Sequence, residues 1–239
     1  MLLTQEEKLS FSLYFLISKK RIELGKFDTA FAPIPSSVNA PASAELRLAV
    51  VIDSKFSWMN GHSEGRQKVS LPFMNIQEAG YSFTDLQCLI DQKLSFDPAG
   101  NKMKVVETIK WHNETQAKNL TNITLSGPPQ VYDHLSLLYK LRNIDLRQTE
   151  IVSLAVLYSN RLFPILVEYA YRESRDVRDK KTECRVYKLR PNNVELAPYK
   201  KQLKFREGTV WVTNDDRCLP VSIQIQTQEG FMFADLLKF

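Results

Sequence analysis

Two groups of neighbouring polar residues are of the types that acid–base or nucleophilic chemistry uses. Asp215 and Asp216 are adjacent carboxylates, and many glycosidases work with two carboxyl groups. Asp133-His134 stands close to Ser136, which suggests a nucleophile beside its base. Adjacent residues of a β-turn rarely face each other, however, and adjacent residues of a helix point about 100° apart. We therefore predict that the Asp pair forms a turn and that Asp133 caps a helix.

Glu168 is a carboxylate in the middle of an apolar run, Leu162 to Tyr171. An unpaired buried charge is costly, so this side chain must find a partner or line a cavity. We expect it to pair with an arginine or to lie at a sheet edge. The alternative is the acid of a hydrolase whose second carboxylate is distant in the sequence.

The sequence carries no metal or cofactor motif. Cys88, Cys184 and Cys218 are far apart, whereas a zinc site needs about four clustered ligands. Gly-x-Ser-x-Gly, His-Glu-x-x-His and Gly-rich phosphate loops are also missing. We predict no metal and no cofactor, and we favour a protein that is not an enzyme. Unpaired cysteines are the favoured expectation, although Cys184 and Cys218 could pair in an oxidising compartment.

The C-terminal end of the chain alternates apolar and polar residues with the period of a β-strand. Val221, Ile223 and Ile225 fall on one face of such a strand, with serine and glutamine on the other. The polar run Asn214 to Arg217 and the single Gly230 supply turn residues on either side. This pattern predicts a β-meander.

Similar alternation recurs along most of the chain and is strongest from Lys8 to Ile17. A change of face across Gly25 predicts a β-bulge, and the polar stretch 111–129 is predicted as a loop or irregular edge. One helix is expected from Asp133 to about Arg142. About ten to twelve strands then form one mostly antiparallel sheet that must curl or close, or else a two-sheet β-sandwich. Residues 1–239 are taken as a single mainly β domain.

Parts of this pattern resemble a known bacterial family. Val210 to Thr213, Arg217, Leu219 to Val221 and Gly230 are similar to the closing motif of the family called domain of unknown function 3108. Asp133 to Arg142 resembles the helical segment of that family, and the likeness is strongest over 130–239. It implies a large, strongly curved antiparallel sheet or half-barrel with one or two short helices, in outline like the lipoprotein-carrier folds.

The same resemblance implies a cellular location. It suggests an uncharacterised, non-enzymatic protein of the bacterial cell envelope, periplasmic or exported, whose leader has been removed from the sequence before Met1. Residues 1–7 lack the basic and apolar regions of a signal peptide, so a cytoplasmic protein is the alternative.

A cavity on a curved sheet could hold a lipid-like or polymeric ligand. Alternation places Phe163, Val167, Tyr169 and Tyr171 on one face of a strand, and Trp211 lies on a later strand. We predict these side chains, with Glu168 beside them, as the ligand-binding residues. The remaining alternative is a structural or partner-docking module without a cavity.

The net charge of +5 is concentrated in one segment. Residues 172–206 hold 12 Lys or Arg and 5 Asp or Glu, a pattern that favours a solvated face and leaves an anionic envelope ligand open. Few aromatic residues are interleaved there, so nucleic acid is not expected as a partner. No apolar run approaches the roughly 18 residues of a membrane span. The sequence does not indicate an oligomeric state.

Overall fold

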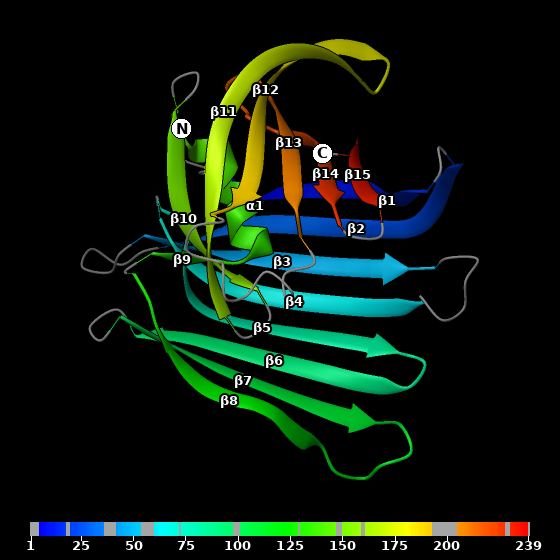
Figure 1. The fold of residues 1–239 in the computed structure, drawn as a ribbon, viewed down its shortest axis with the longest axis vertical. Helices are drawn as coiled ribbons and strands as arrows, with labels where there is room; N and C mark the ends of the chain where they lie inside the picture. Colours follow the sequence, from blue (N-terminus) through cyan, green and yellow to red (C-terminus); the bar gives the residue numbers. More distant parts are fainter. Residues whose placement is uncertain are drawn as a thin grey trace.

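Among the residues that the computed structural model describes, fifteen strands form one sheet that curls around a short helix (Figure 1). The described residues are 5–17, 20–35, 42–53, 60–71, 73–97, 101–128, 130–146, 150–158, 161–192, 205–227 and 230–238. The strands are β1 Glu7–Ile17, β2 Lys20–Ile34, β3 Ser43–Ile52, β4 Gly61–Ser70, β5 Asn75–Asp85, β6 Cys88–Asp97, β7 Lys102–Trp111, β8 Lys118–Ser126, β9 Val131–Tyr132, β10 Ile151–Tyr158, β11 Arg161–Val177, β12 Lys180–Pro191, β13 Glu207–Thr213, β14 Pro220–Gln226 and β15 Phe231–Lys238. The helix α1 spans His134–Asn143.

The strand order is β8-β7-β6-β5-β4-β3-β2-β1-β15-β14-β13-β12-β11-β10-β9. The two ends of the described chain meet in the middle of the sheet, where β1 pairs with β15. All pairs are antiparallel except β9 with β10. This confirms the predicted curved antiparallel sheet, and the strands do not divide into the two sheets of the sandwich alternative.

The curl brings one edge of the sheet back to the opposite half. Val131 of β9 and Leu157 of β10 pack in one apolar cluster with Ile76, Leu94 and Val105 of β5–β7. Curling stabilises a strongly twisted sheet of this size, because apolar side chains on its concave face then lose contact with water. The interior is therefore more closed than a half-barrel.

The helix begins where the sequence predicts it. The Asp133 carboxylate accepts hydrogen bonds from the backbone N–H groups of Leu135 and Ser136, and the Ser136 hydroxyl oxygen accepts one from the Asp133 N–H. This reciprocal capping box satisfies N–H groups that have no partner within the helix. Lys140 and Arg142 in the last turn oppose the negative end of the helix dipole. The predicted capping role of Asp133 is confirmed.

Side chains of α1 fill the interior of the curl. Leu135, Leu138 and Leu141 are buried in a cluster that includes Leu46 of β3 and Val167 of β11. Each such leucine contributes about 1.5–3 kcal/mol relative to an exposed one. The helix thus packs between the two halves of the sheet, on the concave side (Figure 1).

Arg142 joins the end of α1 to two other parts of the chain. Its side chain is 1% exposed and forms an ion pair with Glu7 of β1. Its Nε donates to the Cys218 carbonyl at 3.0 Å, and one Nη donates to the Arg217 carbonyl at 2.9 Å. All three guanidinium nitrogens have an acceptor, which is what a buried cation requires.

Three local predictions can be compared with the backbone. The bulge at Gly25 is confirmed, since the β1–β2 register shifts beside it and its φ is +147°. The stretch predicted as a loop or irregular edge contains the edge strand β8, whose register with β7 shifts beside Glu107, so the irregular edge is confirmed; Ile123 and Leu125 of β8 pack inward. The segment 172–206, predicted as a solvated face, includes the end of the β11–β12 hairpin, which continues to an exposed tight turn at Arg178-Asp179, while residues 193–204 lie outside the described residues. Both turn residues have positive φ, as a type I′ hairpin turn requires.

Replacement of Glu7 by Gln should destabilise the protein strongly. The Arg142 guanidinium would remain buried without its carboxylate, and loss of one partner of a buried pair costs about 3–5 kcal/mol. Denaturant unfolding measures the change as a lower midpoint with an unchanged slope.

The matched control is Glu6→Gln. Glu6 pairs with Lys8 at 3.7 Å, and both side chains are mostly exposed, so this change should alter stability by less than about 0.5 kcal/mol. Equal midpoints for the two variants would show that Arg142 does not depend on Glu7.

Candidate functional site

A groove runs across the outer face of the sheet, opposite to the side that holds α1. Its volume is about 870 Å³, and it crosses β1 to β6. The side chains that line it come from alternate positions of these strands: Lys8, Ser10, Asp28, Ala30, Arg47, Ala49, Glu64, Arg66, Ser82, Asp91 and Lys93, with Gly80 in the floor. A second hollow of about 540 Å³ shares Arg66, Gly80 and Lys93 and continues toward β7.

The strand register places the cations of this groove in one row. Lys8 pairs with Ala30, Ala30 with Arg47, and Arg47 with Arg66. Arg66 in turn pairs with Gly80, and Gly80 with Lys93. Five spacings of about 4.8 Å between neighbouring strands make the row about 24 Å long. We call Lys8, Arg47, Arg66 and Lys93 the cation row.

A parallel row, two residues away from the cation row on each strand, carries the acids. Asp28 pairs with Ala49, Ala49 with Glu64, Glu64 with Ser82, and Ser82 with Asp91. We call Asp28, Glu64 and Asp91 the acid row. Residues i and i+2 of a strand lie about 6.5–7 Å apart on the same face. The groove thus has one positive and one negative side.

The floor between the charged side chains is made of small residues. A Cβ atom placed on Gly80 would meet no atom within 4 Å, so the space above this glycine is open. Gly65 differs, because on the inner face the Tyr81 ring lies where its Cβ would be. Gly80 therefore leaves the groove open, whereas Gly65 makes room for packing in the interior.

Several groove charges have no ion-pair partner in the described part of the chain. Arg47 pairs with Glu45, and Lys8 with Glu6. For Arg66, Lys93 and Asp91, the described residues supply neither an ion pair nor a side-chain hydrogen bond. The last three charges are free to bind a ligand.

Among the residues predicted from the sequence to bind a ligand, three face the helix. Phe163, Val167 and Tyr169 lie on β11 and are at most 7% exposed. They belong to the apolar cluster that includes the buried side chains of α1. The structure therefore brings these three together, in contact with protein.

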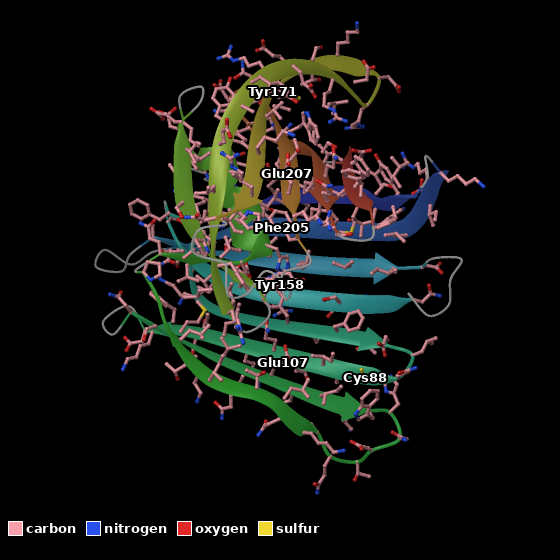
Figure 2. All side chains as sticks on the ribbon, viewed as in Figure 1. Cys88, Glu107, Tyr158, Tyr171, Phe205 and Glu207 are labelled. Atoms are coloured by element: carbon pink, nitrogen blue, oxygen red, sulfur yellow. The ribbon has the colours of Figure 1, made fainter. Side chains whose placement is uncertain are left out.

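The other predicted residues lie elsewhere. The β11–β12 register shifts between Tyr169 and Tyr171, so Tyr171 changes face and is 40% exposed on the curved arm of β11 (Figure 2). Trp211 is buried in a second cluster, with its Nε1 donating to Glu173 and the Arg175 guanidinium 4.1 Å from its ring centre. Their ligand-binding role stays a prediction.

The carboxylates considered for catalysis have structural partners. Glu168 pairs with Arg190 at 3.6 Å, which confirms the expected arginine partner. Asp215 accepts from the N–H groups of Arg217 and Cys218, each at 3.1 Å, so the predicted turn is also confirmed. Such a turn directs the carboxylate to its own backbone and away from Asp216.

Tyr81 connects the capped helix to the sheet. Its hydroxyl donates to the Asp133 carboxylate, and its ring centre lies 5.5 Å from that of His134. Burial, together with the nearby Asp133 charge, raises the pKa of Tyr81 well above its usual value. Tyr81 is therefore a neutral donor that holds the start of α1 in place.

Cysteines and possible metal ligands do not cluster in the described part of the chain. Cys88, Cys184 and Cys218 are free thiols. The described residues contain no group of three or more His, Cys, Asp or Glu side chains arranged to hold a metal ion. In the same residues, no helix has the length and apolar character needed to cross a membrane.

A curled antiparallel sheet around one helix is the architecture of a barrel-like β protein. Over its whole length the chain is similar to the crystal structure of a β-barrel-like protein of domain of unknown function DUF1849 from Brucella abortus, with a TM-score of 0.54 and 8% identity. The match covers 100% of this chain and 98% of that chain. At this identity the likeness shows the fold alone.

The sequence identifies the family. Residues 90–236 match the family described as protein of unknown function (DUF3108), and the chain belongs to that family. This confirms the resemblance seen in the sequence, and the match extends it upstream into β6. The comparison with curated proteins gave no match.

Alkaline pH should destabilise the protein through buried tyrosines. Burial is the main reason that the pKa of Tyr139 is raised to about 12. Because its folded pKa lies above the unfolded value of 10.0, the stabilisation is fully present below about pH 10 and is lost as pH rises through about 12. Denaturant midpoints measured from about pH 9 to 12 should fall.

Tyr139→Phe is the control for this effect. It should flatten part of the pH dependence, and it also removes the contact between the tyrosine oxygen and the Thr29 hydroxyl at 3.2 Å. The same slope in both proteins would mean that Tyr139 does not contribute.

Proposed function

We propose that this protein is a binding protein of the bacterial cell envelope that holds an extended anionic polymer in the outer groove. The observation that carries the proposal is the cation row, four basic side chains spaced along one line of the sheet. Several cations in one row suit a ligand with repeated anionic groups, because each contact adds to the binding free energy while the polymer loses its conformational freedom only once. The envelope location is carried over from the family resemblance.

The charges and the floor of the groove favour a polar polymer over a lipid. Apolar ligands bind where aromatic and aliphatic side chains enclose them, whereas the outward residues between the charges of this open groove are small, as at Ala30, Ala49, Gly80 and Ser82. The predicted apolar residues Phe163, Val167 and Tyr169 pack against protein instead. This contrast supports a ligand that lies on the outer face of the sheet.

Directly opposed like charges also favour a ligand role. Arg47 and Arg66 are cross-strand neighbours, an arrangement that destabilises a sheet when nothing neutralises it. Glu45 neutralises Arg47 within β3, but Arg66 has no partner in the described residues. An anion bound between Arg66 and Lys93 would neutralise Arg66 and so reduce its repulsion of Arg47.

Replacement of either Arg66 or Lys93 by Glu should weaken polymer binding. Each change reverses a charge that faces the open space above Gly80. We expect each single variant to bind a fluorescent oligogalacturonate at least about tenfold more weakly, or about 1.4 kcal/mol. Fluorescence anisotropy measures the affinity, which should fall as salt is added.

Lys110→Glu provides the matched control. Lys110 lies on the outer face of β7, two residues from Thr108, and lines neither hollow. The Lys110→Glu change alters the net charge by the same amount as each groove variant, and it should retain affinity to within about twofold. Equal losses at Lys110 and Arg66 would mean that net charge, and no particular groove, governs binding.

The Gly80→Val variant should weaken ligand binding without lowering the stability of the fold. The added side chain enters open space, and replacement of a strand glycine should raise stability by about 0.5–1 kcal/mol. It should also block the groove and weaken oligogalacturonate binding at least about tenfold. Gly65→Val should instead lower stability, because its Cβ would meet the Tyr81 ring. Unchanged binding by a stable Gly80→Val protein would place the ligand elsewhere.

A further inference from the structure

We infer that the outer groove takes a zwitterionic polysaccharide, a sugar polymer that carries both anionic groups and protonated amines. The inference rests on the proposed function, since it assigns the ligand of the same groove. Its basis is the pair of parallel charged rows, in which each sign has its own side of the groove.

The two rows do not neutralise each other. On this sheet, an arginine and a carboxylate two positions apart do pair elsewhere: Arg21 with Glu23 at 2.5 Å, and Arg47 with Glu45. Arg66 stands two positions from Glu64, and Lys93 two positions from Asp91, yet no ion pair joins either couple in the part of the chain that the structure describes. Opposite charges therefore face the groove separately, although they are close enough to pair after a change of rotamer.

The acid row decides which polymer the groove accepts. A purely anionic chain on the cation row would lie within about 7 Å of Asp28, Glu64 and Asp91, where like charges repel. An amine on the other side of the chain would turn this repulsion into attraction. Specificity for such a chain arises from the repulsion of ligands that carry one sign only.

The position on a sheet face favours sugar over peptide. A bound peptide strand gains affinity when its backbone pairs with a free sheet edge. Every strand from β2 to β6 already pairs on both sides, so it has no free backbone groups to offer. A polysaccharide needs side-chain contacts and a smooth floor, which Ala49 and Gly80 provide between the charged rows. The 24 Å length of about five strand spacings then accommodates several sugar units.

Polymers that share one β-1,4-linked backbone test the inference. The probes are carboxymethyl chitosan, which carries both charges, carboxymethyl cellulose, which is anionic, and chitosan, which is cationic, all as fluorescent oligomers of equal length. The wild-type protein should bind carboxymethyl chitosan at least about tenfold more tightly than either single-sign polymer. N-acetylation of its amines should remove this preference.

Variants of the acid row supply the second readout. Glu64→Gln with Asp91→Asn should weaken binding of carboxymethyl chitosan and strengthen binding of carboxymethyl cellulose, so that the preference disappears. Asp216→Asn, in an exposed turn far along the chain, should leave the preference unchanged. Unfolding midpoints and circular dichroism confirm that each variant is folded.

The outcomes distinguish failure of the zwitterionic assignment from failure of the proposed function. Equal or tighter binding of carboxymethyl cellulose would overturn the zwitterionic assignment and leave the proposed function standing. Tighter binding of an oligopeptide of alternating Lys and Glu would overturn the choice of sugar. If none of the carboxylated polymers binds, the proposed function itself fails.

Discussion

The buried guanidinium of Arg142 is the interaction on which the interior of this protein depends. It holds the last turn of α1, the start of β1 at Glu7 and the turn at Arg217-Cys218 in one place, because each of its nitrogens needs an acceptor. Displacement of any one of these segments would leave Arg142 or Glu7 with an unsatisfied hydrogen bond or ion pair. The helix is fixed at its other end by the Asp133 cap and Tyr81. Both anchors keep α1 inside the curl of the sheet.

A helix fixed in the interior determines where a ligand can bind. Side chains such as Leu138 and Val167 pack into one apolar cluster with α1 on the concave face, so that face serves stability. Successive residues of a strand point to opposite faces, and the same strands therefore present a second, independent set of side chains outward. In the groove that crosses β1 to β6, the outward side chains are charged or small. The sheet thus separates a packed core from a charged groove across the thickness of one backbone layer.

The sequence predicts much of the fold because alternation and capping are local signals. The capped helix at Asp133, the bulge at Gly25 and the turn at Asp215 follow from neighbouring residues alone. Tyr171 escapes prediction because a register shift after Tyr169 reverses its face, and alternation assumes that no residue is skipped. The groove is also not predicted from the sequence, for a different reason. Arg66 and Lys93 become neighbours across Gly80 only when the register of three strands is known, and a single sequence does not specify that register.

Chemical-shift mapping tests most directly that the ligand lies on the outer groove and not in the interior. Backbone amide signals are followed by nuclear magnetic resonance as carboxymethyl chitosan oligomers are added to the isotope-labelled wild-type protein. The largest shifts should come from β3 to β6 around Arg47, Arg66, Gly80 and Lys93, with little change at Val167. Shifts centred on Val167 and the buried residues of α1, with none around Gly80, would contradict a groove on the outer face.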